Sequence, residues 1–154
     1  MTRHRQSFLM HNSSAQDDER TLIYTTYNNI QYLIASITLL SDGTFKTAPT
    51  QFPQLFTVHS VALGYTMSLL YALTIKSYIS VRYIYRKVLA FAGERNLDIN
   101  PPLCMTDFKT ANMNVIRHLP PNAQLKGCSF HFLQSLWQKN IFLGSNMQVY
   151  DNGK

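Results

Sequence analysis

The sequence predicts an α/β or α+β layer fold, in which helices pack on a mixed β-sheet. Charged residues make up only 14% of the 154 residues and hydrophobic residues 45%, and the charged share is well below that of typical soluble domains. Strand-like apolar runs fill the first half of the chain, and they alternate with helix-like periods in the second half. The length suits a single domain with a real core.

The first elements follow a polar N-terminal segment. Residues 1–19 lack an apolar core of signal-peptide length, so we expect a flexible lead-in and no secretion. Residues 20–26 are rich in β-branched and aromatic side chains, which predicts a strand. Residues 28–36 place apolar side chains on one side of a short helix, and residues 36–45 return to strand.

An uncharged region of the chain allows two interpretations. No Asp, Glu, Lys or Arg occurs in residues 47–75, and residues 56–75 are long enough to raise a transmembrane helix as an alternative. The Gly-Tyr pair at Gly64 splits this run into two β-rich halves, residues 55–63 and 66–74. Two strands joined by a short turn explain the break better than one helix does.

The basic residues gather around the next element. Residues 77–96 predict an amphipathic helix with a basic face opposite its apolar face. The net charge is +6 and the pI is near 9.4. This charge fits a polyanion such as DNA, although a solvated basic helix face explains it equally well. The candidate DNA-binding residues are Lys76, Arg82, Arg86 and Lys87.

Strands and helices then alternate to the end of the chain. Residues 99–108 form a short apolar run that ends in Thr-Asp, which is typical of a buried strand that feeds a helix. Residues 109–119 have a helical period that a Pro-Pro pair ends. Residues 123–128 predict a further strand and residues 131–143 a further helix, and residues 145–154 are expected to be a tail.

Two aspartates follow apolar runs, and their spacing allows two roles. If the strands that lead to Asp42 and Asp107 are neighbours, the carboxylates lie within a few ångströms of each other and need a cation. Magnesium suits such a pair, because it binds through one or two carboxylates. Alternatively, Asp42 belongs to a turn and Asp107 caps a helix. Spacing alone favours this second role.

Three motifs in a fixed order alter that balance. The stretches "SDGTFKTAP", "MTDFKTA" and "GCSFHFLQSLWQK" resemble the MULE (Mutator-like element) transposase domain of the DDE superfamily over residues 20–144. The resemblance implies an RNase H-like mixed sheet flanked by helices. It also implies that Asp42 and Asp107 are catalytic and bind Mg²⁺ or Mn²⁺, that Gly43 passes close to the site, and that Phe45 points into the core.

The resemblance also implies a partner and a place in the cell. The partner is DNA, as transposon ends and target, with a homo-oligomer as a further possibility and no membrane. A DNA substrate implies a nuclear location. Cys104 and Cys128 are too few for a secreted disulfide framework, which favours a reducing compartment.

The sequence departs from the family in two places. Lys109 stands where the family commonly has an acid, and it could compete with a metal cation. The third acid of the family lies beyond a further helical segment, and Asp151 is too close to the last predicted helix to replace it. We therefore expect a transposase-derived core for metal-dependent DNA cleavage and strand transfer, as a truncated or inactive copy. The alternatives are a domesticated non-catalytic nucleic-acid-binding module or a membrane-associated protein.

The pair Cys128-x-x-His131 matches the family pattern and suggests a site-adjacent role. Two such residues supply half of the ligands that a structural zinc site needs. The other candidates, Cys104, His59 and His118, have no metal-ligand spacing. We interpret Cys128 as a packed thiol and His131 as a hydrogen-bonded histidine near the acids, with zinc as the alternative.

Overall fold

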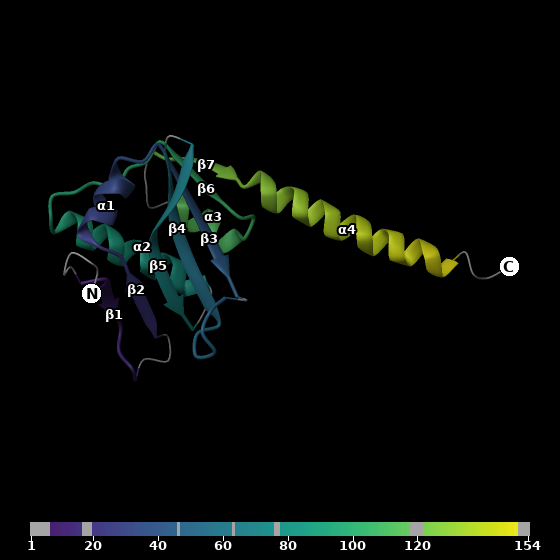
Figure 1. The fold of residues 1–154 in the computed structure, drawn as a ribbon, viewed down its shortest axis with the longest axis horizontal. Helices are drawn as coiled ribbons and strands as arrows, with labels where there is room; N and C mark the ends of the chain where they lie inside the picture. Colours follow the sequence, from purple (N-terminus) through teal and green to yellow (C-terminus); the bar gives the residue numbers. More distant parts are fainter. Residues whose placement is uncertain are drawn as a thin grey trace.

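The computed structural model describes residues 7–16, 20–45, 47–62, 64–75, 78–117 and 122–150. Within these residues the chain forms a seven-stranded mixed sheet and four helices (Figure 1). The predicted α/β or α+β class is therefore confirmed.

The elements follow the predicted order, with one strand added at the start. The strands are β1 (Leu9–Asn12), β2 (Thr21–Tyr24), β3 (Thr38–Thr44), β4 (Gln54–Ala62), β5 (Tyr65–Thr74), β6 (Leu103–Thr106) and β7 (Gln124–Gly127). The helices are α1 (Tyr27–Ile34), α2 (Tyr78–Gly93), α3 (Thr110–Ile116) and α4 (Ser129–Tyr150). The order of strands in the sheet is β1-β2-β5-β4-β3-β6-β7.

One half of the sheet is antiparallel. β3 pairs with β4, and β4 pairs with β5 across a tight turn in which Gly64 has a φ of +79°, a conformation that glycine adopts readily. The prediction of two paired strands in residues 56–75 is confirmed, and the helical alternative for this segment is wrong. Among the described residues, no helix has both the length and the apolar character needed to cross a membrane.

The other half of the sheet is parallel. β3 pairs with β6 and β6 pairs with β7, each in parallel register. α2 connects β5 to β6, and α3 connects β6 to β7, as parallel crossovers require. β3 is therefore the strand at which the sheet changes from antiparallel to parallel pairing. Its register with β6 pairs Ser41 with Thr106, so Asp42 and Asp107 occupy the next positions.

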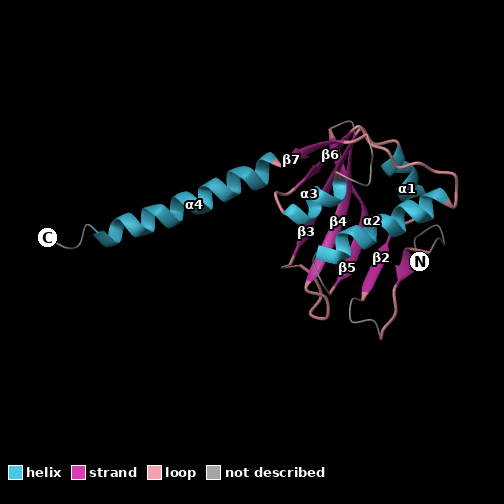
Figure 2. Cartoon of the chain, turned by 180° about the vertical axis from the view of Figure 1, so that it is seen from behind, coloured by secondary structure: helices cyan, strands magenta, loops and turns pink. Residues whose placement is uncertain are grey.

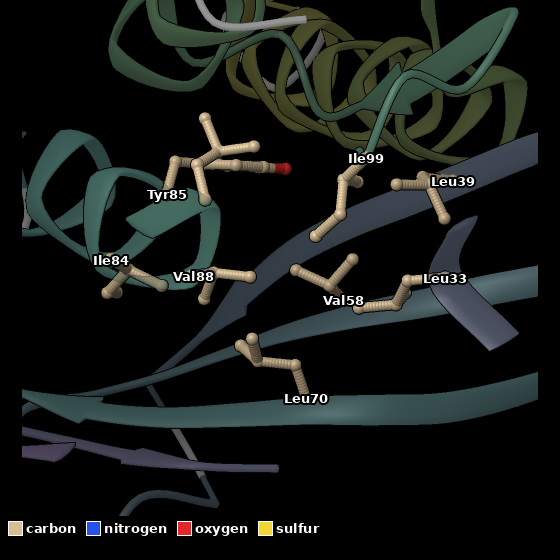
Figure 3. Close-up of a pocket in the computed structure, with 9 residues that line it drawn as sticks. Leu33, Leu39, Val58, Leu70, Ile84, Tyr85, Val88 and Ile99 are labelled. Carbon is tan, nitrogen blue, oxygen red and sulfur yellow. The ribbon is translucent and has the colours of Figure 1, made fainter. Parts of the chain in front are cut away.

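The core lies between the sheet and the helices on one of its faces. Figure 2 shows α2 and α3 in front of the strands, on the same face. Leu33 of α1, Val58 of β4 and Val88 of α2 are buried together there. A cavity of about 20 Å³ remains among them (Figure 3). It is lined by aliphatic side chains and Tyr85 and is large enough for about one water, so it is a packing gap rather than a ligand site.

The two ends of the chain differ from the prediction. β1 lies within the segment that we expected to be a flexible lead-in, and it forms the edge of the sheet beside β2. α4 continues to Tyr150, into the expected tail, and projects away from the sheet (Figure 1). Large apolar side chains on its first turns are exposed, namely Phe130, Phe132, Leu133, Leu136 and Trp137.

The buried face of β3 leaves no room for a side chain at Gly43. A Cβ atom built there would overlap Nε2 of Gln54, a buried residue at the start of β4. A larger residue at this position therefore requires the end of the buried Gln54 side chain to move, and glycine lets the backbone of the strand lie close to its neighbour.

We predict that Gly43→Ala destabilises the fold by about 1–3 kcal/mol, because overpacking forces the Gln54 amide or the strand to move. The free energy of unfolding, measured by urea denaturation, is the readout. In a Gln54→Ala background the added methyl group has space, so the same substitution should cost much less. An equal cost in both backgrounds would show that this contact is not the reason for glycine.

Candidate functional site

The two predicted acids lie at adjacent places in the sheet. Asp42 is inside β3, and Asp107 directly follows β6, one position beyond the last paired residues of these two strands. Neighbouring strands are about 4.8 Å apart, so the two backbones are side by side at this point. The alternative in which Asp42 belongs to a turn is wrong, because Asp42 lies inside β3. The N-cap of α3 is Lys109 rather than Asp107.

Asp107 is buried and its carboxylate is fully engaged. Oδ1 accepts hydrogen bonds from Nδ2 of Asn112 at 2.8 Å and from the backbone N–H of Lys109 at 3.3 Å. Oδ2 lies 3.1 Å from Nζ of Lys109. Donors on both oxygens compensate for the loss of water around a buried carboxylate. They also fix its orientation at the end of β6.

Asp42 is more open, with 42% of its side chain exposed. Its Oδ1 accepts a hydrogen bond of 2.7 Å from the backbone N–H of Gly43 and lies 3.7 Å from Nε2 of His131. His131 reaches this position from the first turn of α4. The start of that helix is held by Cys128, whose N–H donates to the carbonyl oxygen of Thr106 at 2.8 Å. The Cys-x-x-His motif therefore places its histidine beside the first acid.

The structure gives no support to a zinc site among the described residues. No group of three or more His, Cys, Asp or Glu side chains there could hold a metal ion. His118 lies outside the described residues. Cys104 is buried in the core, and burial raises the pKa of its thiol to about 11. A thiol of that pKa stays protonated at neutral pH, and the thiolate is the form that binds metals.

The ammonium of Lys109 contacts both β3 and the end of β6, the places of Asp42 and Asp107. Besides its ion pair with Asp107, its Nζ donates a hydrogen bond of 3.2 Å to the carbonyl oxygen of Gly43. Carboxylate oxygens are the ligands that Mg²⁺ prefers, but the ammonium of Lys109 already pairs with Oδ2 of Asp107. The residues as arranged do not fit a divalent cation.

Phe45 was expected in the core, and this prediction is wrong. Its side chain is 52% exposed, because it follows the end of β3 and turns outward. Its ring lies 4.8 Å from Nζ of Lys109, as in a cation–π contact.

A polar chain beside Asp42 was not predicted. His59 of β4 is hydrogen-bonded through Nδ1 to Oγ of Ser68 at 2.8 Å and through Nε2 to Oγ1 of Thr57 at 2.9 Å. Thr57 donates in turn to the carbonyl oxygen of Asp42 at 3.4 Å. The alternation of β4 was the available signal, since it places Thr57 and His59 on one face, and Thr57 pairs with Asp42.

The basic candidates lie on α2. Arg82, Arg86 and Lys87 are exposed, whereas Lys76 lies outside the described residues. β5 is antiparallel to β4, as β3 is, so β5 and β3 run in the same direction. α2 follows β5. It therefore begins at the same end of the strands as Asp42, which lies near the C-terminal end of β3.

A scan against protein-family models, a search of curated proteins and a search of solved structures each found no match.

We predict that acid destabilises the fold in part through His59. Burial lowers the pKa of His59, and the charge of Asp42 opposes this shift only in part. The unfolded chain then binds more protons than the folded chain, so the free energy of unfolding falls as the pH drops below about 6.5. His11, whose pKa is lowered by burial and by Lys87, acts with the same sign.

Urea denaturation at about pH 5 and about pH 7.5 measures this effect. The loss of stability between the two should shrink in His59→Gln and shrink further in His11→Gln, His59→Gln. A double variant that loses as much stability as the parent would contradict the assignment.

Proposed function

We propose that this chain is a transposase-derived catalytic-core domain with an RNase H-like fold, of the MULE type in the DDE superfamily, and that its partner is DNA. One observation carries the proposal. Asp42 and Asp107 take adjacent positions on neighbouring parallel strands, at the strand where the pairing of the sheet changes. In open α/β sheets, ligands bind beyond the carboxyl ends of strands at such a switch point.

The order of elements supports the proposed fold. Strands β5, β4 and β3 form an antiparallel meander, and β6 and β7 extend it in parallel on the other side of β3. A helix follows β5, β6 and β7 in turn. This mixed sheet is compatible with the RNase H-like sheet that the resemblance implies, with Asp42 on β3 and Asp107 directly after the adjacent strand β6.

The acids as arranged favour an impaired nuclease. Cleavage in this superfamily depends on divalent metal held by carboxylates. In the described part of the chain, no third acidic, histidine or cysteine side chain completes such a group around the two aspartates. The ammonium of Lys109 pairs with one of them. The ion pair specifically favours the alternative of a domesticated, non-catalytic DNA-binding module, which would act in the nucleus.

We predict that the chain binds duplex DNA weakly and with little sequence preference, through Arg82, Arg86 and Lys87 together with Lys76. Each phosphate contact releases a counterion, so affinity should fall steeply with added salt. Fluorescence anisotropy with a labelled duplex measures it. Changing the three arginine and lysine residues of α2 to glutamine should lower the salt slope by up to about three. Lys139→Gln on α4 is the single-charge control. Salt-independent binding, or none, would refute the DNA partner.

We also predict that the chain is a poor or inactive nuclease. Because no third acid accompanies the two aspartates in the part of the chain that the structure describes, the loss of transition-state stabilisation should reduce the rate on the order of a thousandfold. Purified protein is incubated with supercoiled plasmid and Mg²⁺ or Mn²⁺, beside an Asp42→Ala control. Strong nicking by the parent that disappears in this control would show that these residues do supply a complete site.

A further inference from the structure

A lysine ammonium joins the two strand ends that carry the acids. Nζ of Lys109 lies 3.1 Å from Oδ2 of Asp107, the residue that follows β6. The same atom donates a hydrogen bond of 3.2 Å to the carbonyl oxygen of Gly43, the residue after Asp42 in β3. It therefore bridges the two ends across which a shared cation would lie.

The surroundings hold this ammonium in place. The backbone N–H of Lys109 donates to Oδ1 of Asp107, so one residue engages both oxygens of the carboxylate. The centre of the Phe45 ring lies 4.8 Å from Nζ. Asn112 fixes the carboxylate by a hydrogen bond of 2.8 Å to Oδ1. The contact is a network around Asp107 rather than a single exposed ion pair.

The charge of Lys109 opposes a divalent cation at this place. A magnesium ion needs carboxylate oxygens at about 2.1 Å, and Oδ2 of Asp107 already has an ammonium at hydrogen-bonding distance. Two cations on one oxygen repel each other. The formal charges of Asp42, Asp107 and Lys109 sum to −1, where the two acids alone would give −2. The ammonium thus both fills the space and weakens the attraction for metal.

We propose that Lys109 is a built-in counter-ion, which keeps the site of Asp42 and Asp107 closed to Mg²⁺ and Mn²⁺. The inference rests on the proposed function only for the class of cation that the acids would otherwise hold. Removing the ammonium should then create a divalent-cation site. Because 45% of the Lys109 side chain is exposed, the residue can be replaced without opening a hole in the core.

The test is a titration of the full chain with Mn²⁺, followed by the electron paramagnetic resonance signal of the free ion. Lys109→Gln should bind Mn²⁺ at least about tenfold more tightly than the parent, and Lys109→Glu more tightly still. Asp42→Asn added to Lys109→Gln should return the affinity to that of the parent. Circular dichroism confirms folding, and Lys109→Met, which keeps the aliphatic stem, is the second neutral variant.

Two controls separate charge from other effects. Lys109→Arg keeps the positive charge and should leave Mn²⁺ affinity as low as in the parent. Lys139→Gln removes the same charge from α4 and should also change nothing. The inference is overturned if the parent binds as tightly as Lys109→Gln, if the arginine variant gains as much, or if the gain survives Asp42→Asn. No gain in any Lys109 variant would overturn it as well.

The titration contains no DNA, so its result does not depend on the DNA-binding experiment. A gain of Mn²⁺ affinity without DNA binding would leave the counter-ion in place and refute the DNA partner. DNA binding with no gain of Mn²⁺ affinity in the Lys109 variants would refute the counter-ion and leave the DNA partner standing.

Discussion

The parallel pairing of β3 with β6 is the constraint on which the site depends. It sets Asp42 and Asp107 side by side, although the residues are far apart in the sequence. Two carboxylates at this spacing need compensating charge or hydrogen bonds. The chain supplies them around Asp107 from Lys109 and Asn112. Leaving a buried carboxylate without its hydrogen-bond partners is costly, so the contact of Asp107 with Asn112 is part of the fold as well as of the site.

The parallel pairing of β6 with β7 brings further groups close together. Gly127 ends β7 opposite Thr106, and a Cβ atom there would lie 2.5 Å from the ring of Phe108. That ring also contacts Phe132 in the first turn of α4, with centroids 6.1 Å apart. Together with the hydrogen bond from the N–H of Cys128, this packing sets where α4 begins. The position of His131 beside Asp42 therefore follows from the packing of the parallel strands.

The elements that bury apolar side chains were predictable from the sequence, because their periodicity reports which face meets the core. β1 was missed because it is a short edge strand with polar residues such as His11 and Asn12, and edge strands carry weak patterns. The neighbourhood of Asp42 and Asp107 came from motifs. The contacts of the Lys109 ammonium with Asp107 and Gly43, and the exposure of Phe45, could not be predicted. They depend on how the chain turns after β3 and β6 end, which no local pattern specifies.

The electrostatics of the acid pair connect the proposed partner with the proposed counter-ion. Phosphates carry negative charge, so two uncompensated carboxylates at the end of the strands where α2 begins would repel the DNA that we propose the basic residues attract. A metal-dependent nuclease removes that repulsion with bound metal and uses the same ion for chemistry. Lys109 removes part of the repulsion with one tethered positive charge, and an ammonium cannot act as a Lewis acid. On the proposed function, a single residue thus lets the domain keep its contact with DNA while it loses cleavage.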